Sequence, residues 1–129
     1  MKTIALAATA ALLTVPTTLA GVAPAHAGDD DRLRTGSCSG SATWKIKAGP
    51  DDGRMEVEAE VDSNRTGQTW RWTLRHDGAV VDTGGSVTRG PSGSFQVERR
   101  PADSAGTDSY TFRAVHRATG QVCLARISR

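Results

Sequence analysis

The sequence predicts an all-β fold, a single antiparallel β-sandwich of seven to eight strands. Three observations predict it. Apolar and polar residues alternate with a period of two in seven or eight short segments. Turn signals rich in Gly, Pro, Asn and Asp separate these segments at intervals of roughly 8 to 15 residues, a spacing typical of sandwiches. No segment shows the 3.6-residue period of an amphipathic helix.

The clearest strand is RMEVEAEVD (54–62), in which apolar residues alternate with four acidic ones. A helix would spread those acidic residues around its circumference, so the alternation favours a half-buried strand. The segment ATWKIKA (42–48) precedes it and is separated from it by the turn PDDG (50–53). Lys45 and Lys47 are therefore expected opposite the glutamates, as ordinary cross-strand pairs on a solvated surface.

The rest of the chain continues the pattern. The further segments expected to be strands are 70–75, 79–83, 86–88, 94–100, 109–117 and 121–127, with a break expected at the two glycines 84 and 85. Every aromatic residue after position 27 falls on the inward phase: Trp44, Trp70, Trp72, Phe95, Tyr110 and Phe112. Because large apolar residues are few, we expect Trp70 and Trp72 in the core, with Arg71 pointing outward between them.

The first 27 residues have the features of a secretory signal peptide. A short basic start, an apolar run over residues 4–15 and the small residues Ala25 and Ala27 indicate cleavage before Gly28. The run is too short to span a bilayer, so no membrane span is expected. We expect a secreted, extracellular protein with a flexible leader over residues 28–37 and one domain over residues 38–129.

Cys38 and Cys123 are the two cysteines of the chain, and outside the cytoplasm such a pair predicts a disulfide. Free thiols or half a metal site are the alternative, but no CxxC or histidine spacing supports a metal. Each cysteine lies near the start of a strand, the first and the last. The starts of two antiparallel neighbours lie at opposite ends, so a disulfide requires that these strands run in the same direction.

The segment DSAGTDSYTFRA (103–114) resembles the corner before the sixth strand in immunoglobulin-like domains. The resemblance implies that the Tyr110 hydroxyl bonds backbone a few residues upstream, and that Trp72 or Trp70 is the core tryptophan of the third strand. Phe112 stands where the conserved cysteine would be, so fibronectin type III-like domains are the closer relatives. The whole chain also resembles small secreted actinobacterial proteins of this build, which are functionally uncharacterised.

The same resemblance implies which strands share a sheet. The first, second and fifth strands form one sheet, and the signs of its outward residues largely cancel: Lys45, Lys47, Glu56, Glu58, Glu60, Gln96 and Glu98. The third, sixth and last strands form the other. Its outward residues include Arg71, Arg75, Arg113 and Arg117, with no acidic residue among them. This arginine set is the candidate binding face.

Little in the sequence indicates catalysis, so we expect no enzyme, no catalytic residue, no cofactor and no metal. His76 and His116 are the two histidines of the mature chain, and no G-x-S-x-G motif occurs. The stripe of glutamates lies on an open strand face, with no pocket to raise a carboxyl pKa for glycoside hydrolysis. The aspartate run at residues 29–31 lacks the spacing of a calcium loop.

Two function classes remain. The first is a secreted, non-enzymatic recognition or structural module, whose partner through the arginine face is an anionic polymer of the cell envelope or an acidic protein surface. The alternative is an inhibitor of an extracellular hydrolase, with Arg89 in the loop TRGPSGS as bait. Nucleic acid is not expected, because the formal net charge is only +2 and the aromatic residues are needed inside. We expect a monomer.

Overall fold

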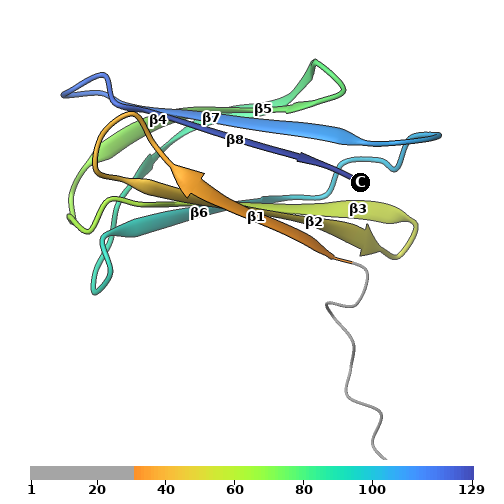
Figure 1. Cartoon of the computed structure of the whole chain (residues 1–129), viewed down its shortest axis with the longest axis horizontal. Coiled ribbons are helices and arrows are strands. Elements are labelled where there is room, and N and C mark those ends of the chain that lie inside the picture. The colour runs from red at the N-terminus through yellow and green to blue at the C-terminus, as the bar shows by residue number, and fades with distance from the viewer. Residues whose placement is uncertain (1–30) are drawn as a thin grey trace, which may run out of the picture.

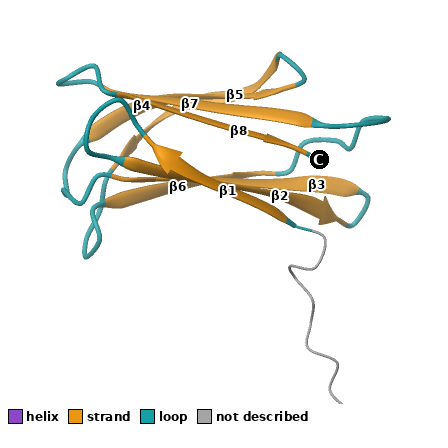
Figure 2. Cartoon of the chain, in the orientation of Figure 1, coloured by secondary structure: helices purple, strands orange, loops and turns teal. Residues whose placement is uncertain are grey.

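The computed structural model describes residues 31–129, which form two four-stranded antiparallel sheets stacked face to face (Figures 1 and 2). In chain order the strands are β1 (Arg32–Ser37), β2 (Thr43–Asp51), β3 (Arg54–Asp62), β4 (Thr69–His76), β5 (Ala79–Val87), β6 (Ser94–Arg99), β7 (Ser109–His116) and β8 (Val122–Ser128). This part of the chain contains no helix. The predicted all-β sandwich is confirmed, and the predicted signal peptide lies outside the described residues.

The sheets have the strand membership that the immunoglobulin-like resemblance implies. One sheet runs in the order β1-β2-β3-β6 and the other in the order β5-β4-β7-β8. The predicted disulfide is present, with the Cα atoms of Cys38 and Cys123 4.3 Å apart. Beside it, the backbone N–H of Ser39 donates to the carbonyl of Val122 at 2.8 Å. The starts of β2 and β8 therefore meet at one end of the sandwich, as the disulfide requires.

The prediction of a flexible leader over residues 28–37 is wrong for residues 32–37. Residues 32–37 form β1, which pairs with β2 in antiparallel register from Arg32 opposite Ala48 to Ser37 opposite Thr43. Almost all of its side chains are exposed, so no apolar alternation marks it in the sequence. Backbone pairing holds it, together with the Trp44 ring, which packs where a side chain at Gly36 would lie.

The predicted break at Gly84 and Gly85 is also wrong, because β5 runs through both glycines without interruption. Gly84 lies opposite Trp72 and faces the sandwich interior, where an added Cβ would lie 2.6 Å from the Trp72 ring. Gly85 faces outward. The first glycine thus makes room for an aromatic ring on the neighbouring strand instead of ending the strand.

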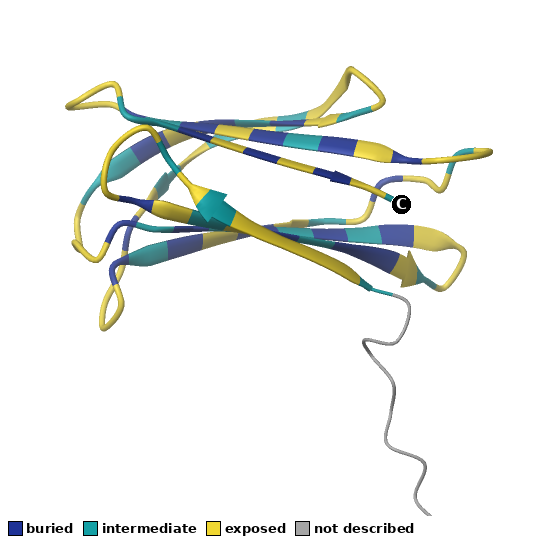
Figure 3. Cartoon of the chain, viewed as in Figure 1, coloured by how far each residue is buried: buried dark blue, intermediate teal, exposed yellow. Residues whose placement is uncertain are grey.

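The core lies between the two sheets and is built from the inward phases of the strands (Figure 3). Along β3 every second residue is buried, from Met55 to Val61. Trp70 and Trp72 are 0% and 5% exposed, which confirms that both belong to the core. Arg71 between them is exposed, as predicted.

Tyr110 differs from the corner tyrosine that the resemblance implies. Its side chain is fully buried, but the hydroxyl has no hydrogen-bond partner among the described residues. The ring instead stacks on His76, with the centroids 4.6 Å apart. Burial, followed by the charges of nearby aspartates such as Asp108, raises the pKa of the Tyr110 phenol. The corner is held by other groups, which are described below.

Candidate functional site

The candidate site is the outer face of the β5-β4-β7-β8 sheet. On the two central strands, arginine and threonine dominate the outward positions: Thr69, Arg71, Thr73 and Arg75 on β4, and Thr111 and Arg113 on β7, with Arg117 just beyond its end. No Asp or Glu occupies an outward position on these two strands. The structure therefore brings all four predicted arginines to one face.

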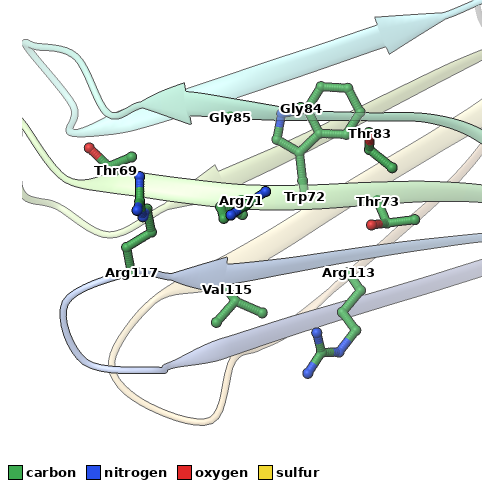
Figure 4. A pocket seen from close by; sticks show the side chains of 10 residues that line it. All are labelled: Thr69, Arg71, Trp72, Thr73, Thr83, Gly84, Gly85, Arg113, Val115 and Arg117. Carbon is green, nitrogen blue, oxygen red and sulfur yellow. The ribbon is translucent and has the colours of Figure 1, made fainter.

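An open hollow of about 750 Å³ lies on this face (Figure 4). Arg71, Arg113 and Arg117 line it, together with threonines from β4 and β5. Gly85 on the edge strand β5 pairs with Arg71 and lines the hollow without a side chain. Arg75 lies outside the hollow, where its guanidinium donates to the carbonyl of Gly78 at 3.1 Å.

The charge of these arginines is not balanced by an ion pair in the part of the chain that the structure describes. Within residues 31–129, none of the four forms an ion pair, whereas Arg99 and Arg100 pair with Asp82 and Asp51 at 2.8 Å. Sequence reasoning missed a fifth arginine of the same face. Arg126 on β8 lies opposite Thr111 of β7 and is exposed. The alternation of β8 about the buried Ala125 and Ile127 was the signal that could have identified it.

The opposite outer face carries charges of both signs with acidic residues in excess, so the predicted cancellation of signs is incomplete. On the β1-β2-β3-β6 sheet, Lys45 and Lys47 lie opposite Glu60 and Glu58, as predicted. The carboxylates of this face are Asp51, Glu56, Glu58, Glu60, Asp62 and Glu98. Two further cations accompany them: Arg54 lies opposite Asp51, and Arg100 pairs with the same carboxylate at 2.8 Å. Partial burial, contact with Asp51 and the charge of Glu98 raise the pKa of Glu56. The two sheets thus present faces of opposite sign.

A second polar cluster lies around His76, at the end of the sandwich opposite the disulfide. Its Nε2 atom lies 2.6 Å from Asp108 Oδ1 and 3.4 Å from Asp77 Oδ2. The hydroxyl of Ser104 donates to Asp108 Oδ1 at 2.5 Å and lies 3.4 Å from the same His76 nitrogen. In a hydrolytic triad the imidazole bridges the acid and the nucleophile through its two different nitrogens. Here Ser104 and Asp108 share one nitrogen, which is not the triad geometry.

Nor does the spacing of these groups fit a bound metal ion. His76, Asp77 and Asp108 bring three ligand atoms within 4.8 Å of one another. Two ligands of a tetrahedral zinc ion, each at about 2.1 Å from it, stand roughly 3.4 Å apart. The 2.6 Å contact between His76 and Asp108 is shorter and is explained by a hydrogen bond.

The loop that contains Arg89 is tightly closed on itself. Arg89 is exposed, but its N–H donates to the Ser94 carbonyl at 2.9 Å and its carbonyl accepts from Gly93 at 2.9 Å. Gly93 has a φ of 76° and is packed against the backbone of Arg65, so the turn is fixed. A bait loop that adds a strand to a protease offers free backbone groups, and the backbone groups of Arg89 are already engaged.

Comparisons with known proteins found no similar protein, so a functional interpretation depends on the residues of this chain. No family model, no curated protein and no solved structure matches this chain. Within residues 31–129, no helix is long and apolar enough to cross a membrane. The arginine face is the feature of this structure that best supports a specific function.

Proposed function

We propose that this chain is a secreted, non-enzymatic recognition module that binds an anionic polymer through the outer face of the β5-β4-β7-β8 sheet. The observation that carries the proposal is the arginine-lined hollow on β4 and β7, which has no carboxylate among its lining residues. Guanidinium groups bind phosphate and carboxylate through two parallel hydrogen bonds. A face that holds several guanidinium groups with no ion pair among residues 31–129 is suited to a partner with repeated negative charge.

The segregation of charge supports binding on one side only. The whole chain has a formal net charge of just +2, so its attraction to a polyanion depends on where the charges lie. The acidic face on the other sheet repels the same partner. The protein would therefore approach with Arg71 and Arg113 toward the polymer and with Glu58 and Glu60 away from it.

Two features support an extracellular location. The disulfide between Cys38 and Cys123 is of the kind that persists in oxidising compartments. The pattern of the first 27 residues is that of a signal peptide. An anionic polymer of the cell envelope would be within reach of a protein exported in this way.

Retention on an anionic matrix tests the proposal. At low ionic strength the wild-type protein should be retained, and the arginine double variant R71A/R113A should not. The matched variant K45A/K47A removes the same charge from the opposite face and should be retained like wild type. Retention should weaken as the Debye length falls from about 30 Å at 0.01 M salt to about 8 Å at 0.15 M. Equal retention of wild type and R71A/R113A would rule out this face as the binding surface.

A further inference from the structure

Directly paired residues of β4 and β7 form rows across the sheet, and the arginines of the binding face lie in successive outward-facing rows. Cross-strand partners place Arg71 opposite Val115, Thr73 opposite Arg113, and Arg75 opposite Thr111. At the end of β7, the N–H of Arg117 donates to the carbonyl of Thr69 at 3.0 Å, which adds a fourth row. Each of the four rows therefore contains one arginine.

The arginines alternate between the two central strands. Passing along the sheet, they come from β7 (Arg117), β4 (Arg71), β7 (Arg113) and β4 (Arg75). Alternate residues along a strand stand about 6.8 Å apart, and neighbouring strands about 4.8 Å. The four arginines thus form a zigzag that advances about 7 Å along the strand direction per arginine, with consecutive Cα atoms about 8 Å apart, over a length of roughly 20 Å. We refer to these four residues as the arginine ladder.

Threonines complete the rows. In three of the four, the residue beside the arginine on the other central strand is a threonine: Thr69, Thr73 or Thr111. A hydroxyl donates one hydrogen bond and accepts others, so each of these rows offers a guanidinium and a hydroxyl side by side. Phosphodiester oxygens accept bonds from both groups, and hydroxyls of a ligand can bond the threonine oxygens.

We propose that the ligand of this face is a linear polyol phosphate, of the poly(glycerol phosphate) type, with one phosphodiester bound at each step of the arginine ladder. This inference rests on the proposed function and specifies its ligand. Three backbone bonds of an extended chain span about 3.3–3.6 Å, so the six-bond repeat of poly(glycerol phosphate) spans about 7 Å. That repeat matches the spacing of the rows, so each phosphodiester meets a guanidinium and, in three rows, a threonine hydroxyl as well, while the hydroxylated linkers span the distance between rows.

Other polyanions match the face less well. Inorganic polyphosphate places a charge at every second backbone bond, roughly 3 Å apart, so fewer than half of its phosphates would meet an arginine. Double-stranded DNA carries a phosphate about every 3.4 Å along each strand. Single-stranded nucleic acid has a suitable repeat, but its binding gains from bases stacked on exposed aromatic rings. The tryptophans of β4 are buried, and no aromatic side chain projects outward from β4 or β7.

Isothermal titration calorimetry with three polymers at equal phosphate concentration tests the ligand class. Poly(glycerol phosphate) should bind about tenfold more tightly than polyphosphate or oligothymidylate of the same charge, a difference of about 1.4 kcal/mol. Equal affinity for all three would overturn the inference but leave the proposed function in place. Tighter binding of oligothymidylate would point to nucleic acid and overturn it as well. If no polyanion binds, both proposals fail.

Two charge-matched pairs of variants test the spacing. T73R/R113T moves an arginine across its row and keeps one charge per row, whereas R113V/V115R moves it to the row of Arg71. The first should bind poly(glycerol phosphate) within about twofold of wild type, and the second should lose about tenfold. Equal affinities of the two would mean that total charge, and not its spacing, determines binding.

The second pair uses single surface substitutions, which keeps the test available if a double variant fails to fold. R71T removes a step of the ladder, while R126T removes the same charge from β8, beside the ladder. R71T should weaken binding at least about threefold more than R126T does. Equal losses would overturn the ladder. Circular dichroism of each variant establishes that the sheets are intact before affinities are compared.

Discussion

His76 Nε2 lies 2.6 Å from Asp108 Oδ1, and this contact joins the end of β4 to the segment that leads into β7. The same carboxylate accepts bonds from the hydroxyl and the N–H of Ser104. The backbone of Asp108 also exchanges two hydrogen bonds with Arg129, at 2.6 and 2.8 Å. Asp108 therefore fixes the corner that the Tyr110 hydroxyl was expected to fix, and it holds the C-terminal residue as well.

The buried carboxylate of Asp108 predicts loss of stability in acid. Burial by itself raises the pKa of Asp108, but the hydrogen bonds from Ser104 and His76 lower it by more. The net result is a pKa of about 2, below the ordinary value of 3.8. A carboxyl whose pKa is depressed in the folded state stabilises the fold above its unfolded pKa. That contribution is lost as the pH falls from 3.8 toward 2. We expect the melting temperature, followed by circular dichroism, to drop through this window.

The variant D108N isolates the contribution of this residue. It should melt at a lower temperature than wild type at neutral pH, and its melting temperature should fall less between pH 3.8 and 2. Asp52 lies in the exposed turn between β2 and β3 and is not among the groups that contact Asp108, so D52N serves as the control and should keep the acid transition. Parallel pH profiles of D108N and wild type would contradict this role of Asp108.

The orphaned hydroxyl of Tyr110 predicts an unusual result for a conservative change. A buried hydroxyl without a partner costs about 1–3 kcal/mol, and replacement by Phe removes it without opening a cavity. Y110F should therefore be as stable as wild type or more stable in urea denaturation. In a domain pinned by a corner tyrosine the same substitution destabilises. A loss of more than about 1 kcal/mol would show that the hydroxyl has a partner in solution.

The two adjacent glycines of β5 should respond differently to the same substitution. At Gly84 an added methyl group would lie 2.6 Å from the Trp72 ring, which the core holds in place. At Gly85 the nearest atom is the Trp70 carbonyl oxygen at 3.7 Å, an ordinary contact. We expect G84A to cost about 1–3 kcal/mol by overpacking. We expect G85A to be neutral or stabilising by up to about 1 kcal/mol, since it restricts the unfolded chain. Equal stabilities in chemical denaturation would contradict this view of Trp72.

Much of the fold could be predicted because its signals are local. Alternation over residues 54–62 marks β3, since a strand buried on one face needs a period of two. The phase of Trp70 and Trp72 follows from the same rule. The disulfide and the common direction of β2 and β8 follow from the position of two cysteines relative to two strands. The arginine face then follows from which strands share a sheet. That grouping was implied by the resemblance of residues 103–114 to immunoglobulin-like domains.

What could not be predicted depends on contacts between distant residues. β1 is exposed on both faces and held by backbone pairing, which leaves no apolar pattern. A glycine is required at position 84 because the Trp72 ring of the neighbouring strand occupies the space of a side chain. The pairing of His76 with Asp108 joins residues 32 positions apart and has no local signature. The register that forms the arginine ladder likewise appears only when β4 and β7 are aligned.

The disulfide should stabilise the fold without being required for it. Its cysteines are 85 positions apart, and closing a loop of that length restricts the unfolded chain by about 4–5 kcal/mol on the entropy model. Reduction should therefore lower the melting temperature while the β-sheet signal of circular dichroism remains below the transition. The variant C38A/C123A should be less stable than the reduced protein, because Cys123 is fully buried in the core. An unchanged melting temperature after complete reduction would contradict the prediction.

The two tryptophans that flank Arg71 should differ from it, and from each other, in their contribution to stability. Trp70 is fully buried, stacks on His116 at 5.1 Å and donates from its indole to Gln68 at 3.2 Å. Trp72 lies under the edge strand, where the Arg99 guanidinium covers its ring at 5.2 Å.

Replacement of either tryptophan by alanine should cost about 3–5 kcal/mol, as large-to-small core changes do. The loss at Trp72 should be the smaller, since β5 and Arg99 can close over the space at the edge. R71A removes an exposed side chain with no ion pair among the described residues, and it should cost less than about 0.5 kcal/mol. Urea denaturation of the three variants measures all of these differences. A neutral tryptophan variant would mean that its ring is a surface group, and a costly R71A would mean that Arg71 supports the sheet as well as the binding face.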